Sequence, residues 1–211
     1  MDYRRAWHQG GTYFFTVNLL QRKNNALLID HIDLLRKVVA QVKKSHPFTI
    51  HAWVVLPEHL HCVVELPDGD ADFKTRWMLI KMLFSRAIPK NEWRSDIRIH
   101  RRERGIWQRR YWEHLIKNEA DYRAHVDYVH INPVKHGLVK QVKDWPYSTF
   151  HKLVEQGVYH QDWGGGMEVD LTLEDWDDET YGVPQAGTPY KDWYRALKIS
   201  RVFLRFFIKL R

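Results

Sequence analysis

A long apolar stretch that turns back on itself most constrains the fold of this chain. Residues 48–56 and 60–66 are both rich in apolar side chains, which is typical of buried strands. Only a short connection that includes Pro57 and Glu58 separates them. We therefore predict an antiparallel hairpin, which needs a hydrophobic core to pack against.

Two histidines stand at the start of the second strand of this hairpin. Because strand side chains alternate between faces, His59 and His61 share one face, and Leu60 and Cys62 point into a core on the other. Two imidazoles on one face form half of a metal site. The same spacing also fits a pair of surface histidines on a half-exposed strand, so spacing alone leaves both interpretations open.

The composition favours one domain with a tail. The chain has 211 residues, 44% of them hydrophobic, and its single cysteine excludes both an intrachain disulfide framework and a multi-cysteine zinc site. It contains no run of about 18 apolar residues that could span a membrane. No apolar signal-like stretch follows residues 1–5. We therefore expect a cytoplasmic protein.

Positive charge is concentrated between Lys74 and Arg110. This segment holds twelve Lys or Arg residues against three acidic ones, a net charge of +9, so the rest of a chain of net charge +7 carries −2. Trp77, Trp93 and Trp107 are interleaved with the cations. Guanidinium groups and aromatic planes together suit phosphates and unstacked bases. The alternative is a solvated basic face with no specific ligand.

The remaining periodicity predicts an α+β fold. Residues 12–19 read as a strand, 27–44 as a helix, and 73–84 as a second helix that Asp70 and Asp72 could cap. The order strand, helix, strand, strand, helix resembles the ferredoxin-like arrangement. We expect a ferredoxin-like or RRM-like antiparallel sheet with helices on one face.

The later part of this arrangement is less regular. Residues 90–106 are charged and lack a clean period, which predicts a loop. Residues 105–113 are the best candidate for a final strand. A further helix is expected over 119–131, ending near Pro133.

That last helix carries a candidate nucleophile. Tyr128 and Asn132 are four residues apart and therefore neighbours on one helical face, which His125 borders. A tyrosine hydroxyl can attack phosphorus and form a phosphotyrosine, but its pKa of about 10 means that it needs a base or a metal. The alternative is that Tyr128 simply packs the helix against the sheet.

The composition changes after residue 165. Residues 168–179 hold seven acids and no base, and residues 191–211 hold seven bases and one acid in a pattern typical of an amphipathic helix. We therefore divide the chain into a domain of residues 1–165 and a tail of residues 166–211. The terminal helix could contact DNA, a membrane surface or the acidic stretch, and docking on the chain's own body is the simplest expectation.

Several ordered motifs resemble those of the REP-associated tyrosine transposases, domesticated relatives of the single-strand insertion-sequence transposases with one catalytic tyrosine. The segment PEHLHC at 57–62 resembles the HUH motif, in which U is hydrophobic. The segment YVHINPVKHG at 128–137 resembles the tyrosine motif of the family. The other similar segments are 3–5, 10–19, 107–114 and 144–151. The resemblance covers about residues 3–165.

This resemblance implies an HUH endonuclease fold with a divalent metal. His59 and His61 would bind Mg²⁺ or Mn²⁺, and Tyr128 would be the nucleophile. In the insertion-sequence relatives the third ligand is a glutamine four residues after the tyrosine, a position that Asn132 occupies here. Substitutes for this shorter side chain are His125, His130 and Glu58.

The resemblance also implies a DNA substrate. The family acts at repetitive extragenic palindromes, which fold as hairpins with a short guide sequence at the foot. A single strand would lie over the sheet face that carries the two histidines and would be cleaved through a 5′-phosphotyrosine intermediate that allows rejoining. The residues expected to bind DNA are Arg4, Arg5, Lys74, Arg76, Lys81, Arg86, Arg109 and Arg110.

Two other classes of function compete with this interpretation. One is a non-catalytic protein that binds single-stranded nucleic acid and derives from a transposase. The other is a metal-dependent hydrolase with water as nucleophile, which would leave no protein–DNA adduct. The sequence leaves open whether the chain is a monomer or a homodimer.

Overall fold

A four-stranded antiparallel sheet forms the centre of the computed structural model, which describes residues 8–164. The strands are β1 (Thr12–Asn18), β2 (Thr49–Val55), β3 (His59–Glu65) and β4 (Trp112–Leu115), in the order β2-β3-β1-β4. Asn18 pairs with His59, and Thr12 with Glu65, so the histidines lie at the end of the sheet where β1 finishes. The predicted hairpin and the α+β class are confirmed.

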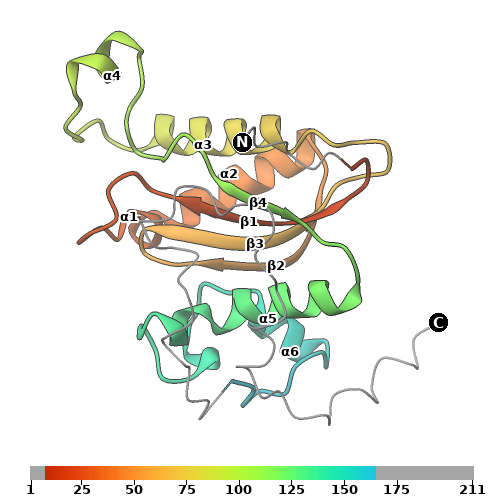
Figure 1. The fold of residues 1–211 in the computed structure, drawn as a ribbon. Coiled ribbons are helices and arrows are strands. Elements are labelled where there is room, and N and C mark those ends of the chain that lie inside the picture. The colour runs from red at the N-terminus through yellow and green to blue at the C-terminus, as the bar shows by residue number, and fades with distance from the viewer. Residues whose placement is uncertain (1–7, 165–211) are drawn as a thin grey trace, which may run out of the picture. The chain divides into compact units, whose positions relative to one another are not determined.

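One face of the sheet packs on helices α1 (Leu27–Asp30), α2 (Ile32–Ser45) and α3 (Phe73–Ala87), as Figure 1 shows. The helix predicted at 27–44 is interrupted at His31, which caps both halves. The predicted cap of α3 is confirmed, because Asp72 accepts a hydrogen bond from the Thr75 N–H at 3.0 Å. Side chains from both layers meet in the main core, among them Phe15, Leu60, Cys62, Val38, Phe73 and Trp77.

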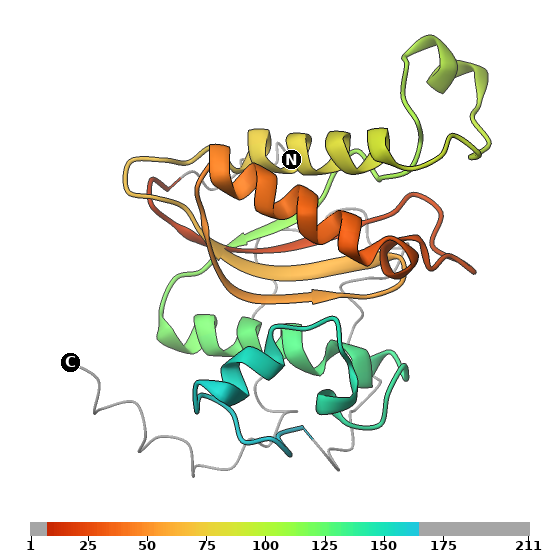
Figure 2. The same cartoon turned by 180° about the vertical axis from the view of Figure 1, so that it is seen from behind.

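The opposite face is covered by α5 (Glu119–Lys135), with η1 (Val142–Asp144) and α6 (Phe150–Glu155) beyond it (Figures 1 and 2). The helix predicted over 119–131 begins at the predicted residue, but it continues through Pro133 to Lys135. Proline removes one donor but leaves the next bonds intact, so His136 N–H still donates to the Asn132 carbonyl at 3.0 Å. Gly137, at φ +66°, then ends the helix.

The final strand and the charged stretch before it differ from prediction. The candidate strand 105–113 overlaps β4 only at Trp112 and Glu113. The rest of that candidate strand, residues 105–111, forms one isolated bridge, between Leu19 and Trp107. The stretch predicted as a loop also contains a short helix, α4 (Asp96–His100). Gly105, at φ +71°, turns the chain just before this bridge, so regular pairing with β1 starts later.

The segment after α5 ties that helix layer back to the free edge of β2. Thr149 N–H donates to the Trp53 carbonyl and Trp53 N–H donates to Thr149 Oγ1, each at 2.8 Å. Val55 N–H donates to the Tyr147 carbonyl at 2.9 Å, and Trp145 Nε1–H donates to the Val55 carbonyl at 2.9 Å. These bonds cover an otherwise exposed strand edge and fix the position of α5. The motif at 144–151 thus has a structural explanation.

The outer side of α5 packs on a second aromatic cluster. Tyr159 lies with its ring centroid 4.7 Å from Trp163 and 5.4 Å from His130. Its hydroxyl donates to Asp127 Oδ1 at 2.5 Å. Burial raises the pKa of Asp127 to about 6 despite this bond.

This raised pKa predicts a pH-dependent stability. An unfolded aspartate has a pKa of about 3.9, so the folded state binds more protons than the unfolded state between about pH 4 and pH 6. The free energy of unfolding therefore falls as the pH rises from about 4 through about 6. Asn cannot ionise, so the Tm of Asp127→Asn minus that of the wild type should increase by on the order of a few degrees between pH 4 and pH 8. Thermal melts across this range, with Asp33→Asn on the exposed side of α2 as control, test it. Parallel profiles for wild type and Asp127→Asn would contradict it.

The helices show no sign of a membrane segment. Within residues 8–164, none is both long and apolar enough to cross a bilayer. The predicted acidic stretch and basic helix of the tail, and the division at residue 165, lie outside the part of the chain that the structure describes.

Candidate active site

The two histidines are buried side by side at the start of β3. His59 and His61 are both 0% exposed, and their ring centroids lie 4.8 Å apart at an interplanar angle of 84°. His59 Nδ1–H donates to Glu58 Oε1 at 3.0 Å, and His61 Nδ1 lies 2.9 Å from Thr16 Oγ1. Such partners fix ring orientation and tautomer, as the outer partners of metal-binding histidines do. With Nδ1 engaged, Nε2 is the nitrogen that would bind a metal.

Helix α5 brings the predicted nucleophile against this pair. The ring of Tyr128 lies 5.3 Å from that of His61, and the ring of His136 lies 5.1 Å from that of His59. Asn132 is one turn from each of these two residues on the same helical face. It therefore faces the histidine pair, and it is 0% exposed.

The side chain of Asn132 indicates that a metal ion would fit at this site. Within the described residues, neither Oδ1 nor Nδ2 of this side chain has a hydrogen-bond partner, although both atoms are buried. Leaving a buried amide unsatisfied is costly unless another ligand uses it. Two imidazoles and an amide oxygen form a donor set compatible with a divalent cation such as Mn²⁺. The structure thus brings together Tyr128, His59, His61 and Asn132.

The three substitutes for the third ligand have other partners. Glu58 orients His59 and lies 3.6 Å from Arg22. His125 contacts Asp121, and His130 lies against Ser148 on the outer side of α5, 3.1 Å from its hydroxyl. Burial lowers the pKa of His130 to about 3, so this ring stays neutral.

Phe14 is a site residue that the sequence alone did not reveal. Its ring centroid lies 5.7 Å from both His61 and Tyr128, and 4.9 Å from His125. It therefore packs beside the direct contact between Tyr128 and His61 and touches both rings. The alternation of residues 12–18 predicts which side of the strand Phe14 occupies, but only the structure shows that α5 covers that side of the sheet. His136 could have been found from its spacing of eight residues from Tyr128, two helical turns along the same face.

The expectation of an open sheet face is wrong. Tyr128 is 6% exposed and both histidines are fully buried, because α5 lies directly over them. A DNA strand can reach the histidines only from the rim of this layer or after a shift of α5. The sequence predicted this helix but not the face on which it packs.

Four predicted DNA contacts lie on α3, on the opposite side of the sheet from Tyr128 (Figure 1). Arg76 is only 5% exposed and forms an ion pair with Asp70 at 2.6 Å, so it holds the fold together and does not lie on a binding surface. Lys81 donates to the Gln108 carbonyl at 3.0 Å, and burial lowers its pKa to about 8. Lys74 and Arg86 are exposed.

The other predicted DNA contacts are less uniform in their placement. Arg109 is exposed and pairs with Glu103 at 2.5 Å. Arg110 is exposed. Arg4 and Arg5 lie outside the described residues.

A second polar cluster attaches β4 to α5. His114 Nε2–H donates to Asp121 Oδ2 at 2.9 Å, His125 Nδ1 lies 3.0 Å from Asp121 Oδ1, and Lys117 N–H donates to Asp121 Oδ2 at 2.9 Å. Burial alone would raise the pKa of Asp121, but these hydrogen bonds bring it well below its usual range. The ligand-capable atoms of the three side chains lie within 4.8 Å of one another. This cluster anchors the half of α5 that precedes Tyr128.

Removal of this carboxylate should destabilise the domain. Asp121→Ala leaves His114 and the Lys117 N–H without their acceptor, whereas His125 keeps its 2.8 Å contact with the backbone carbonyl of residue 121. We expect a loss of about 2–3 kcal/mol in the free energy of unfolding. Urea unfolding measures it. Glu119→Ala is the matched control, because its partner Arg123 is on the same helix and its side chain is 63% exposed. Equal losses in the two variants would contradict the anchoring role.

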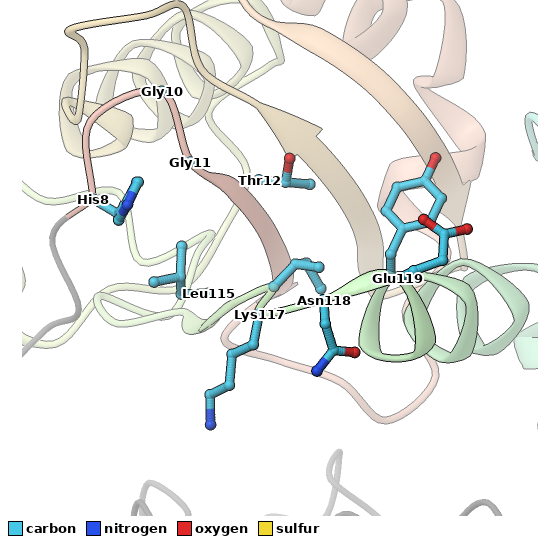
Figure 3. Close-up of a pocket in the computed structure, with 10 residues that line it drawn as sticks. His8, Gly10, Gly11, Thr12, Leu115, Lys117, Asn118 and Glu119 are labelled. Atoms are coloured by element: carbon cyan, nitrogen blue, oxygen red, sulfur yellow. The ribbon is translucent and has the colours of Figure 1, made fainter. Parts of the chain in front are cut away.

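A hollow of the domain lies away from the histidine pair. A cavity of about 550 Å³ lies between the start of β1 and the start of α5, lined by residues such as Gly10, Thr12, Leu115 and Asn118 (Figure 3). Thr12 is at the opposite end of β1 from Asn18, which pairs with His59. The cavity is therefore separate from the histidine pair.

Comparisons with known proteins agree with these motifs. Over 166 residues the chain is 51% identical to a REP-associated tyrosine transposase of Escherichia coli (strain K12), covering 79% of this chain and 92% of that protein. A Haemophilus influenzae protein whose name carries the same family is 43% identical over 172 residues, covering 81% of this chain and 97% of that protein. No family model matches the chain.

A solved structure is also similar. It is the structure of a REP-associated tyrosine transposase bound to a REP hairpin, with a TM-score of 0.68 and 49% sequence identity. The match covers 82% of this chain and 93% of that chain. The two curated relatives and the solved structure are all named as REP-associated tyrosine transposases.

Proposed function

The chain belongs to the family of REP-associated tyrosine transposases, and we propose that it cleaves and rejoins single-stranded DNA next to hairpin-forming repetitive extragenic palindromes. The single observation that carries this proposal is the packing of Tyr128 against His61, 5.3 Å between ring centroids, with Asn132 one turn further along α5. The similarity to a relative bound to a REP hairpin supports the class of substrate.

Tyr128 is the proposed nucleophile. Its oxygen attacks the scissile phosphorus in line, the 3′-hydroxyl of the neighbouring nucleotide leaves, and a 5′-phosphotyrosine forms. Attack of a 3′-hydroxyl on this link reverses the step, so the phosphodiester energy is conserved. Lys135 Nζ lies 5.2 Å from the centroid of the Tyr128 ring. A cation at this position can stabilise the negative charge that develops in the transition state.

We propose His59, His61 and Asn132 as the ligands of Mg²⁺ or Mn²⁺. When bound, the ion would polarise the scissile phosphate and orient it. Glu58 and Thr16 hold the two rings ready for this role. Imidazole suits Mn²⁺ better than Mg²⁺, so we expect Mn²⁺ to support activity at the lower concentration.

We propose that the substrate enters from the rim of the sheet. His59 belongs to the strand end where β1 finishes, and Arg22 lies nearby against Glu58. We propose that the scissile phosphate approaches from this end. We also propose a cytoplasmic location with association with the nucleoid when DNA is bound.

A second candidate is supported by the burial of the site. Because both histidines are 0% exposed, a protein that binds hairpin DNA without cleaving it is the alternative function. It predicts DNA affinity with no covalent adduct under any metal condition.

Tyr128→Phe tests the nucleophile. We expect this variant to bind a hairpin-bearing single strand with unchanged affinity but to form no covalent adduct, because only the attacking oxygen is removed. Gel analysis of denatured reactions and mass spectrometry of the linked peptide measure it. Tyr122→Phe is the matched control on the same helix, where its hydroxyl contacts His51 and not the histidine pair. A metal-dependent adduct in Tyr128→Phe would overturn the assignment.

His61→Gln tests the metal site. An amide replaces the imidazole with little change in volume, so the variant should fold yet need at least about tenfold more Mn²⁺ for half-maximal cleavage. The stabilisation of the protein by Mn²⁺ in thermal melts should fall in parallel. His51→Gln is the control, because His51 lies in β2 and pairs with Glu65. Normal cleavage and metal response in His61→Gln would exclude the proposed ligand role.

A further inference from the structure

We propose that residues 89–105, which we call the arm, bind the unpaired DNA strand next to the hairpin by stacking a base on Trp93 and holding phosphates with Arg101 and Arg102. This inference rests on the proposed function and names one contact surface for its substrate. Figures 1 and 2 show the arm, with α4, projecting from the end of α3 away from the sheet.

The arm is anchored at the end of the sheet that carries the histidine pair. Just after it, the Ile106 carbonyl accepts a hydrogen bond from Leu20 N–H at 2.8 Å, and Gln108 N–H donates to the Asn18 carbonyl at 3.0 Å. Asn18 is the direct pairing partner of His59. A strand that enters the site from this end therefore passes the base of the arm.

Arg104 gives the arm a defined shape. Its guanidinium donates to Glu92 Oε1 at 2.7 Å and Oε2 at 2.5 Å, and also to the Ile88 carbonyl at 2.9 Å, the Pro89 carbonyl at 2.6 Å and the Ser85 carbonyl. These bonds fasten the returning chain to the end of α3. The hydrogen bonds from Arg104 bring the pKa of Glu92 down to about 2, so the pair stays ionised at neutral pH. A pre-formed arm loses less entropy on binding.

The exposed surface of the arm has the chemistry of a single-strand contact. Trp93 is 82% exposed, Ile97 65% and Ile99 51%. Of these, the indole of Trp93 offers an open aromatic face on which a base can stack. The arm holds six Lys or Arg residues against three acids, and one acid, Glu92, is already paired within it. Within residues 8–164, Arg101 and Arg102 are exposed and form no ion pair.

This combination favours an unpaired strand over a duplex stem. An exposed indole can stack only on a base whose face is open, whereas the bases of a stem are stacked on each other. Guanidinium groups beside it neutralise the phosphates on either side of that base. Binding of the stem is an outcome that the test distinguishes.

Fluorescence anisotropy in EDTA on two labelled hairpins tests the inference, one with an unpaired flank and one blunt. Trp93→Ala should weaken binding of the flanked hairpin by about 5- to 150-fold and leave the blunt one unchanged. Trp93→Phe should restore part of the loss. Arg101→Ala with Arg102→Ala should lower the salt slope by about 1.4, as expected for two phosphates of a single strand. The control is Lys43→Ala with Lys44→Ala, two exposed cations of α2.

The outcomes separate this inference from the proposed function. If the arm variants bind the flanked hairpin like wild type, or lose as much as the α2 control, the inference fails whether or not Tyr128 forms an adduct. An equal loss on the blunt hairpin would show stem binding and overturn it as well. If the arm variants behave as expected but wild type forms no adduct with Mn²⁺, the arm stands and the catalytic proposal fails.

Discussion

The packing of α5 on the sheet sets the distance between the two halves of the proposed active site. His59 and His61 belong to β3, where hydrogen bonds to two neighbouring strands hold them. Tyr128 belongs to a helix that reaches this face through side-chain contacts alone, with Phe14 touching both His61 and Tyr128. The catalytic geometry is therefore only as well defined as this interface. A shift of about 1 Å in such an arrangement costs much of the rate.

The fold secures the same interface from three sides. Asp121 links the first half of α5 to β4 through His114. The segment 145–149 pairs with the edge of β2 and returns the chain to the sheet. On the outer side, the cluster around Tyr159 packs on the helix. Because these contacts surround the proposed site, polar residues that do not touch Tyr128 help to fix its position against the histidine pair.

The features that the sequence predicted correctly depend on local chemistry. The alternation that places His59 and His61 together, and the cap of α3 at Asp72, follow from neighbouring residues alone. The errors concern long-range packing. Arg76 carries a charge typical of a surface, but Asp70 and the Pro47 carbonyl take up its donors in the interior. Pro133 normally ends a helix, yet here the packed last turn continues past it. Nothing local indicates that α5 covers the histidines.

The cations of the domain lie in two places, on α3 behind the sheet and beside Tyr128, and we expect them to have different effects on DNA. The cations of α3 lie behind the sheet, and a Debye length of about 8–10 Å in physiological salt screens most of their field at Tyr128. They can steer a polyanion toward the domain but do little for a phosphate in the site. The cations that the structure places beside the proposed site are Lys135, against the Tyr128 ring, and Arg22, 3.6 Å from Glu58. Both side chains are partly buried, and charges there interact through a lower effective dielectric constant than in water. We therefore expect these two cations to affect a phosphate at the proposed site more than the larger charge behind the sheet.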